Sequence, residues 1–275
     1  MEKLTKENYK SCHEYLSYSR FSKFLRCEAS AAINFREPSS VAQLVGSYVD
    51  AYFSDEMEEF KKDHPEIYNS KTGQLKTDFL KAEEIIQRIK TDEKFMKLLS
   101  GEKQAIMTGE IEGVPFKIKM DSYIPGKAIV DLKVMKDFNK VWSESYRTYT
   151  NFMIAYDYDI EMAIFQEIVY QNTGVKLPCY IAAITKETPS DIGAFVIPQN
   201  KLDEAMDVVR RTLKDRIKPI LNGEIAPHRC EKCYYCRATK KTRIFDWELV
   251  GLDGDKLREE GIKCDDPKLN NKEEN

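Results

Sequence analysis

Two aspartates and a lysine in the middle of the chain have residue types and a spacing that suit phosphate chemistry. Asp121 is followed ten residues later by Asp131, and Lys133 comes two residues after Asp131. Carboxylate oxygens are preferred ligands of hard divalent cations. A lysine beside such a cation can stabilise the charge that develops on a phosphate. The three residues therefore predict a site that holds a divalent metal beside a scissile phosphate.

The alternation of apolar and polar residues places these side chains on strands. At positions 114 to 120 and 130 to 134 the even-numbered residues are apolar, whereas the odd-numbered ones include Lys117, Lys119, Asp121, Asp131 and Lys133. Strand side chains alternate between the two faces of a sheet. Each strand therefore has one face to bury, and both aspartates belong to the polar one.

The turn between the two strands decides whether the acids meet. A three-residue loop at 125–127 puts Ile124 opposite Ala128 and Asp121 opposite Asp131. A two-residue Pro-Gly turn would place the acids on opposite faces, so we reject it. Like charges directly opposite each other destabilise a strand pair, and a bound cation would reverse that penalty. The register therefore supports a metal between the strands.

The order of these motifs resembles the PD-(D/E)XK nuclease superfamily, and most closely its phage recombination exonucleases, a family that includes lambda exonuclease. The resemblance rests on Asp121, on Asp131 to Lys133, and on the helical segment from Tyr158 to Phe165. Three further stretches match the family: 22–29 (SKFLRCEA), 44–52 (LVGSYVDAY) and 229–237 (RCEKCYYCR).

The resemblance implies roles for individual residues. Asp121, Asp131 and the main-chain carbonyl of Leu132 would hold Mg²⁺ or Mn²⁺, and Lys133 would orient or deprotonate the attacking water. Asp50 stands where relatives place a histidine or glutamate that completes the metal shell. An aspartate can coordinate a metal directly or through water, so Asp50 is a further candidate ligand.

A fourth catalytic candidate lies on the helix after the core. Relatives carry Gln-x-x-x-Tyr there, and matching on 158–163 puts Glu161 and Phe165 at these positions. Gln166 and Tyr170 have the expected spacing five residues later, about 140° further around the helix. The register favours Glu161, which we add to Asp121, Asp131 and Lys133.

The resemblance implies an Mg²⁺-dependent exodeoxyribonuclease of phage-type recombination. Such an enzyme degrades linear duplex DNA from its ends, digests the 5′-ended strand, works with a single-strand annealing protein and assembles as a homo-oligomer. Two alternatives stay open. The chain could be a related endonuclease or single-strand nuclease with an iron–sulfur cluster, or a nucleic-acid-binding module without activity.

Four cysteines form a second candidate site. Cys230, Cys233 and Cys236 follow one another at three-residue spacing in a cysteine-rich segment, 228–237, and Cys27 stands alone near the N-terminus. One early and three late cysteines resemble the iron–sulfur staple of some nucleases of this superfamily. Thiolates also suit tetrahedral zinc, with His228 as an alternative ligand. A 4Fe-4S cluster, Zn²⁺ and free thiols all stay open.

Composition excludes several classes of protein. At 275 residues and 42% hydrophobic the chain can bury a full core, and no stretch approaches the length of apolar residues that spans a bilayer. The charged N-terminus has no signal-peptide pattern, so we expect a cytoplasmic protein without membrane contact. Seven cysteines, an odd number, argue against a disulfide framework. A net charge of −3 argues against binding nucleic acid by bulk charge.

The order of elements predicts an α/β fold, with a restriction-endonuclease-like core in which helices flank a mixed central β-sheet. We expect a nuclease domain over 1–250 and a charged, disordered tail over 251–275. The expected strands are 104–112, 114–123, 128–134, 177–185 and 192–197. The expected helices are 40–53, 77–99, 138–149, 155–173 and 201–221.

Overall fold

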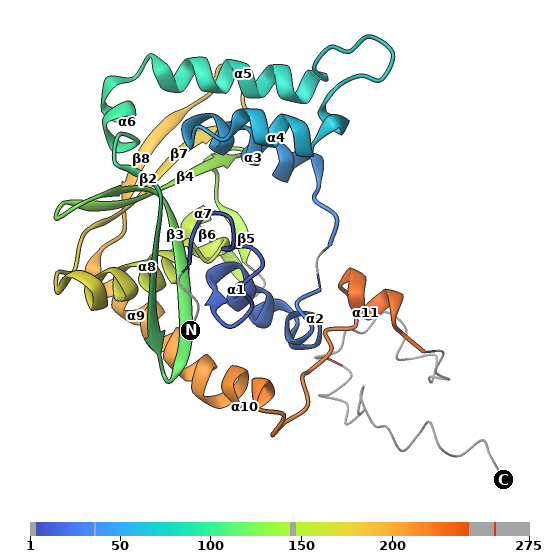
Figure 1. Ribbon diagram of the computed structural model, residues 1–275, viewed down its shortest axis with the longest axis vertical. Coiled ribbons are helices and arrows are strands. Elements are labelled where there is room, and N and C mark those ends of the chain that lie inside the picture. Colours follow the sequence, from blue (N-terminus) through green and yellow to red (C-terminus); the bar gives the residue numbers. More distant parts are fainter. Residues whose placement is uncertain (1–3, 36, 144–146, 242–255, 257–275) are drawn as a thin grey trace. The chain divides into compact units, whose positions relative to one another are not determined.

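A computed structural model of the 275-residue chain describes residues 4–35, 37–143, 147–241 and 256 (Figure 1). The chain divides into two compact units. The first unit comprises residues 1–15 and 39–210, and the second comprises 16–38 and 211–275. Within the described residues, no helix combines the length and the apolarity that crossing a membrane requires. Most of the expected 251–275 tail lies outside the described residues.

The first unit is built on a mixed sheet. β2 (Glu102–Ile111), β3 (Val114–Ile124) and β4 (Ala128–Met135) form an antiparallel meander. β7 (Cys179–Thr185) pairs with β4 in parallel, and β8 (Ile192–Val196) pairs with β7 antiparallel. The parallel step needs a crossover, which a helix between β4 and β7 provides. The expected α/β class with a mixed central sheet is confirmed.

Two turns fix the register of the meander. Ile111 pairs with Val114, which leaves Glu112 and Gly113 as a two-residue turn with φ of 52° and 73°. Positive φ at both positions is the geometry that suits a tight hairpin. Ile124 pairs with Ala128, so residues 125–127 form the expected three-residue loop. Gly126 has φ of 67°, a conformation that glycine adopts without strain.

One layer of helices covers the apolar face of the strands. α3 (Val41–Phe53) begins at a capping box made by Ser40 and Gln43, and α5 (Thr77–Lys90) packs beside it. Their apolar side chains share a core with Val130, Leu132, Ala182 and Ile184 of the sheet, as Figure 1 shows for the elements. The even-numbered residues of β4 therefore face α3 and α5. The layer also contains α4 (Met57–Asp63), the 3-10 helix η1 (Pro65–Ile67) and α6 (Glu93–Leu98).

The other face of the sheet is covered as well. α8 (Tyr158–Thr173) packs against β2, β3, β4 and β7, and most of its residues from Ile160 to Val169 are buried. It ends at Gly174, which has φ of 74°. Because α8 lies over the odd-numbered side of the strands, that side is a largely buried polar site. The short α7 (Phe152–Ala155) precedes it, and α9 (Gln199–Thr212) follows β8.

Two expected helices differ from the structure. In place of the helix expected over 138–149, β5 (Val141–Ser143) pairs antiparallel with β6 (Thr148–Thr150), and we call this strand pair the hairpin. Its valine, threonines and aromatic residues favour strands, and Trp142 and Tyr149 pair across it with ring centroids 5.5 Å apart. The segment 77–99 forms two helices because Asp92 caps a new one, α6.

The second unit is mostly helical in its described part. It contains β1 (Leu16–Ser17), α1 (Tyr18–Arg26), α2 (Glu28–Ala32), the π-helix η2 (Leu213–Ile217), α10 (Lys218–Leu221) and α11 (Tyr234–Ala238). Glu28 joins the early and late segments of this unit, because its carboxylate accepts two hydrogen bonds from Arg216, at 2.8 and 2.7 Å. Such a bidentate pair fixes geometry as well as adding energy.

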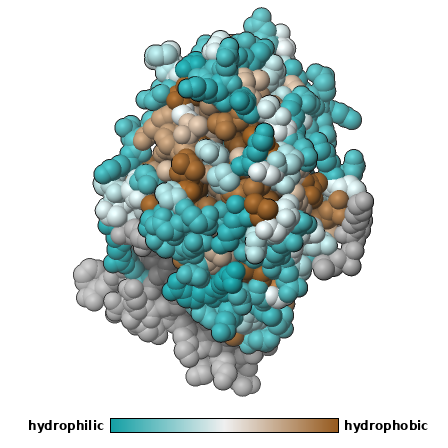
Figure 2. Space-filling view, turned by 90° about the vertical axis from the view of Figure 1, so that its left-hand side faces the viewer, coloured by the Kyte–Doolittle hydropathy of each residue, from teal (hydrophilic) through white to brown (hydrophobic). Residues whose placement is uncertain are grey.

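The surface is mainly hydrophilic. On the face in Figure 2, hydrophobic side chains show between larger areas of hydrophilic ones. Exposed apolar side chains are ordinary on folded proteins. Large aromatic side chains are less common there, and Trp142 (46% exposed), Tyr149 (65%) and Tyr156 (40%) are exposed in this chain.

Candidate active site

Asp121 and Asp131 lie where β3 and β4 stop pairing. The ladder between these strands runs from Ile124–Ala128 to Ser122–Val130, and the two aspartates are the next residues on each strand. Instead of a backbone pair, the N–H of Leu132 donates to Asp121 Oδ2 at 2.9 Å. The strand register is as expected, and a carboxylate occupies the place of the next ladder bond.

Lys133 connects β4 to α8. Its Nζ lies 2.7 Å from Asp131 Oδ2 and 2.9 Å from Glu161 Oε2. The ammonium also lies over the ring of Tyr158, 4.9 Å from the centroid. Both acids are largely buried. Lys133 is therefore held between two carboxylates and an aromatic face, a contact that favours a cation.

Gln166 has a different role from Glu161. Its Nε2 donates to the carbonyl of Leu177 at 2.8 Å and to Gln199 Oε1 at 2.9 Å. The structure thus brings Glu161 to the lysine and uses Gln166 to join α8 to the segments before β7 and at the start of α9.

Gln104, which we did not expect in the site from the sequence, contacts both Asp50 on α3 and Asp121 on β3. Gln104 Nε2 lies 3.5 Å from Asp50 Oδ1 and 3.5 Å from Asp121 Oδ1. In the register of β2 and β3, Gln104 stands opposite Asp121, yet this pair is absent from the ladder, and Gln104 has φ of 53°. Among the described residues, its buried Oε1 has no hydrogen-bond partner. The two-residue turn at 112–113 already places Gln104 opposite Asp121, so the sequence did contain the indication.

Burial and mutual repulsion raise the pKa values of the carboxyl groups of Asp50 and Asp121. Burial, together with Asp131, raises the pKa of Asp50 to about 6, although Lys119 opposes the shift. Burial, Asp50 and Asp131 raise the pKa of Asp121 well above its ordinary value. Carboxylates that repel one another in a buried site are stabilised by a cation between them.

Lys133 and Glu161 shift each other's pKa values. Burial lowers the pKa of Lys133, but Asp131 and Glu161 raise it more, so the net direction is upward. Burial raises the pKa of Glu161 to about 7, with Lys133 opposing the shift and Asp131 adding to it. The lysine therefore stays charged at neutral pH.

The donor atoms are of the chemical kind that binds a hard divalent cation. The carboxylates of Asp50, Asp121 and Asp131 supply oxygen ligands of the kind that Mg²⁺ and Mn²⁺ accept. The N–H and C=O of a residue in an extended strand point to the same neighbour. Because the N–H of Leu132 points to Asp121, its carbonyl lies on the same side and can complete the set.

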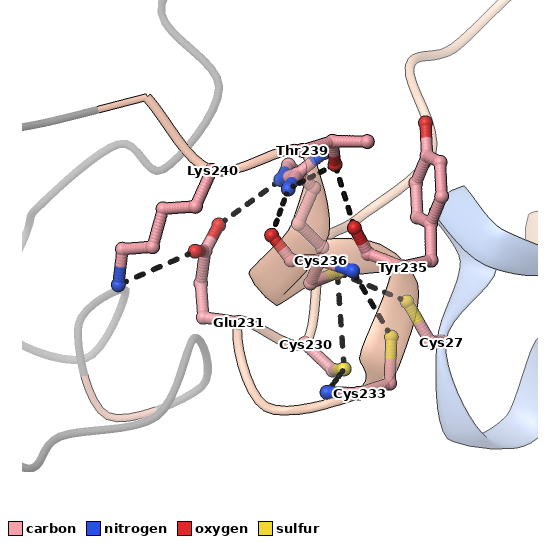
Figure 3. A network of polar contacts seen from close by, with 9 residues as sticks. Cys27, Cys230, Glu231, Cys233, Tyr235, Cys236, Thr239 and Lys240 are labelled. Carbon is pink, nitrogen blue, oxygen red and sulfur yellow. Dashed lines mark hydrogen bonds and ion pairs between the residues drawn. The ribbon is translucent and has the colours of Figure 1, made fainter.

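The four candidate cysteine ligands lie together in the second unit. The Sγ atoms of Cys27, Cys230, Cys233 and Cys236 all lie within 4.8 Å of one another, and Figure 3 shows them converging. This group does not include His228, whose Nδ1 lies 3.8 Å from Glu28. The sequence spacing thus corresponds to one compact group of thiols.

Comparisons with known proteins agree on the class of domain. The model of a family described as a PDDEXK-like domain of unknown function (DUF3799) matches residues 17–239. The crystal structure of a protein from Eubacterium rectale, provisionally named an exonuclease, is 44% identical, with a TM-score of 0.85. That match covers 92% of this chain and 100% of the other.

Two further comparisons add nothing to this. The crystal structure of SSO0001 is 11% identical over 83% of this chain and 96% of its own, with a TM-score of 0.31, and it carries no argument. No curated protein sequence matches.

Proposed function

Because the chain belongs to the PDDEXK-like family DUF3799, we propose that it is a metal-dependent nuclease that degrades linear duplex DNA from its ends. The observation that carries the proposal is the position of Lys133 between Asp131 and Glu161, together with the carboxylates of Asp121 and Asp50, which both face the amide of Gln104. The Eubacterium rectale relative, which bears an exonuclease name, supports the choice of an exonuclease.

Each residue has a role in this proposal. Asp121, Asp131, Asp50 and the carbonyl of Leu132 would hold Mg²⁺ or Mn²⁺. The bound metal supplies a water that ionises easily and neutralises charge on the phosphate. Gln104 holds the carboxylates of Asp50 and Asp121 near each other, because its amide faces both.

Lys133 would act through its positive charge and would not take a proton from the attacking water. Two carboxylates against one ammonium keep that ammonium protonated. A protonated lysine orients the attacking water and stabilises the charge that builds on the phosphate oxygens. Glu161 is a positioning residue in this scheme, because it holds the side chain of Lys133 from the α8 side.

The hairpin of β5 and β6 is our candidate for contact with the DNA end. Trp142 and Tyr149 are exposed on it, and the exposed cations Lys140 and Arg147 flank its two strands. Bases stack on aromatic side chains, and cations bind the phosphates between them. A ring series joins this region to the site, because Phe138 stacks on Phe152 at 5.5 Å and Phe152 contacts Tyr158 at 6.5 Å.

Several finer points belong to the same proposal. We propose that the 5′-ended strand is digested, that the 3′ overhang passes to a single-strand annealing protein, and that the enzyme works as a homo-oligomer. Residues 1–250 would form the nuclease, since the family match spans 17–239. A ring around DNA would let a chain with a net charge of −3 remain on its substrate.

One experiment tests the function directly. Purified protein is incubated with end-labelled linear and circular duplexes, with Mg²⁺ or with EDTA, and each strand is followed separately. We expect Mg²⁺-dependent shortening of the 5′-ended strand of linear DNA only. Cutting of circles would make the protein an endonuclease, and binding without cleavage in any metal would make it a binding module.

A further inference from the structure

Four cysteine side chains form a compact group within the second unit. Cys27 lies between α1 and α2. Cys230 lies in the segment that leads into α11, Cys233 is the N-cap of this helix, and Cys236 lies within it (Figure 3). Cys27 Sγ lies 3.5 Å from Cys236 Sγ, and Cys230 Sγ lies 3.9 Å from the same atom. We propose that these four thiolates hold a single zinc ion in a tetrahedral structural site.

The sulfur–sulfur distances separate zinc from an iron–sulfur cluster. Four thiolates around one zinc at a Zn–S distance of about 2.3 Å stand about 3.8 Å apart. The ligands of a four-iron cluster each bind a different iron atom, which puts their sulfurs about 6 Å apart. All four sulfurs of this chain lie within 4.8 Å of one another. A single ion fits this group, whereas a cluster would require it to open.

The same distances argue against disulfides. A disulfide joins its sulfurs at about 2.05 Å, and the described cysteines are all free thiols. A disulfide between two of them would also use only two of the four sulfurs. A tetrahedral ion uses all four sulfurs at the separations that the structure has.

Backbone donors are already directed at the sulfurs. The N–H of Cys233 donates to Cys230 Sγ at 3.3 Å, and the N–H of Cys236 donates to Cys233 Sγ at 3.4 Å. Such bonds stabilise negative charge on a thiolate ligand. They arise from two overlapping Cys-x-x-Cys turns, a spacing common in structural zinc sites.

The surrounding contacts hold the early cysteine against the late ones without help from a metal. The N–H of Ala29 donates to the carbonyl of His228 at 2.9 Å, and the N–H of His228 donates to Glu28 Oε2 at 2.7 Å. Arg229 donates to the carbonyl of Cys236 at 2.8 Å. The ring of Phe35 packs against those of Tyr234 and Tyr235. The site is therefore largely preformed, and three of its four cysteines are buried.

Metal content is the first test. The full chain is purified both in air and without oxygen, and zinc and iron are measured per chain together with the visible spectrum. We expect one zinc, no iron and a colourless protein in both preparations. Replacement of zinc by Co²⁺ should give the visible bands of a tetrahedral cobalt thiolate. Bound iron with broad absorbance at about 400 nm would show an iron–sulfur cluster and overturn the zinc proposal. A metal-free protein with four reactive thiols would show that these cysteines hold no metal.

Variants then locate the metal. Cys236→Ser should lose the zinc and lower the melting temperature on the order of 10 °C, because metal binding contributes directly to folding. Cys233→His, at the most exposed of the four, should keep one zinc and shift the cobalt spectrum, which covers the case in which the serine variant does not fold.

Two matched controls complete the experiment. Cys12→Ser removes a buried cysteine outside the group, and Asp131→Asn changes the acidic site. Both should keep the zinc. Loss of zinc in Asp131→Asn, or its retention in Cys236→Ser, would place the metal elsewhere and overturn the proposal.

Discussion

The ammonium of Lys133 on β4 lies 2.9 Å from the carboxylate of Glu161 on α8. This contact crosses from the sheet to the helix that covers it. The same ammonium contacts Asp131, a proposed metal ligand, at 2.7 Å. In the proposed mechanism, Glu161 therefore acts as a positioning residue, because it holds the ammonium of Lys133 in place. Replacement of Glu161 should therefore lower activity by displacing the ammonium of Lys133.

The first prediction compares variants of Lys133 with variants of its two carboxylate partners, Asp131 and Glu161. Lys133→Ala and Asp131→Ala should each abolish cleavage in a folded protein, because both charges are needed mainly in the transition state. Glu161→Gln keeps the shape and should lower kcat about 10- to 100-fold with little change in KM. The measurement is cleavage of end-labelled linear duplex with Mg²⁺. Cleavage at the wild-type rate by Lys133→Ala would remove the lysine from the mechanism.

The second prediction concerns the repulsion between Asp121 and its neighbours. Asp121→Asn keeps an oxygen that can accept the Leu132 N–H, but it removes a charge whose pKa burial and Asp50 raise. The metal-free variant should therefore melt a few degrees higher than the wild type, at about 2 to 4 °C per kcal/mol. Wild type should gain stability from millimolar Mg²⁺, and the variant should gain less. An unchanged wild-type melting temperature on adding Mg²⁺ would contradict a preformed site.

The third prediction is a pH dependence of the metal-free protein. The pKa of Asp50 is about 6 in the folded state against an ordinary value of 3.8. Between these values the folded state binds more protons than the unfolded state, so stability falls as the pH rises from about 4 to about 6. Urea unfolding in EDTA at a series of pH values measures this. Asp50→Asn should flatten the curve, and a curve unchanged in that variant would assign the effect to other groups.

The central strands of this fold could be predicted because their signals, the alternation of apolar and polar residues and the turn residues, lie within short segments of the chain. Alternation and turn residues fixed the register of β2, β3 and β4, and with it the approach of Asp121 and Asp131. The prediction of a helix over 138–149 was wrong, because β5 and β6 are only three residues long each, too short for an alternating pattern to be recognised. The position of Gln104 opposite Asp121 followed from the turn at 112–113 and was overlooked, whereas its positive φ is not indicated by any residue pattern. The four cysteines came together as one group, but the choice of ion needed distances.

The last prediction tests the hairpin as a contact for the DNA end. Trp142 is 46% exposed and pairs mainly with Tyr149, so Trp142→Ala should leave the melting temperature within about 2 °C of the wild type. If the ring stacks on a base, its removal costs on the order of 1 to 3 kcal/mol of binding. We then expect KM to rise at least 5-fold while kcat changes less than 2-fold, because the site of Lys133 is untouched. Tyr170→Ala is the matched control: this aromatic is 43% exposed and lies nine residues beyond Glu161 on α8, about 14 Å along the helix. Equal losses in the two variants, or none in Trp142→Ala, would show that the hairpin does not hold the DNA.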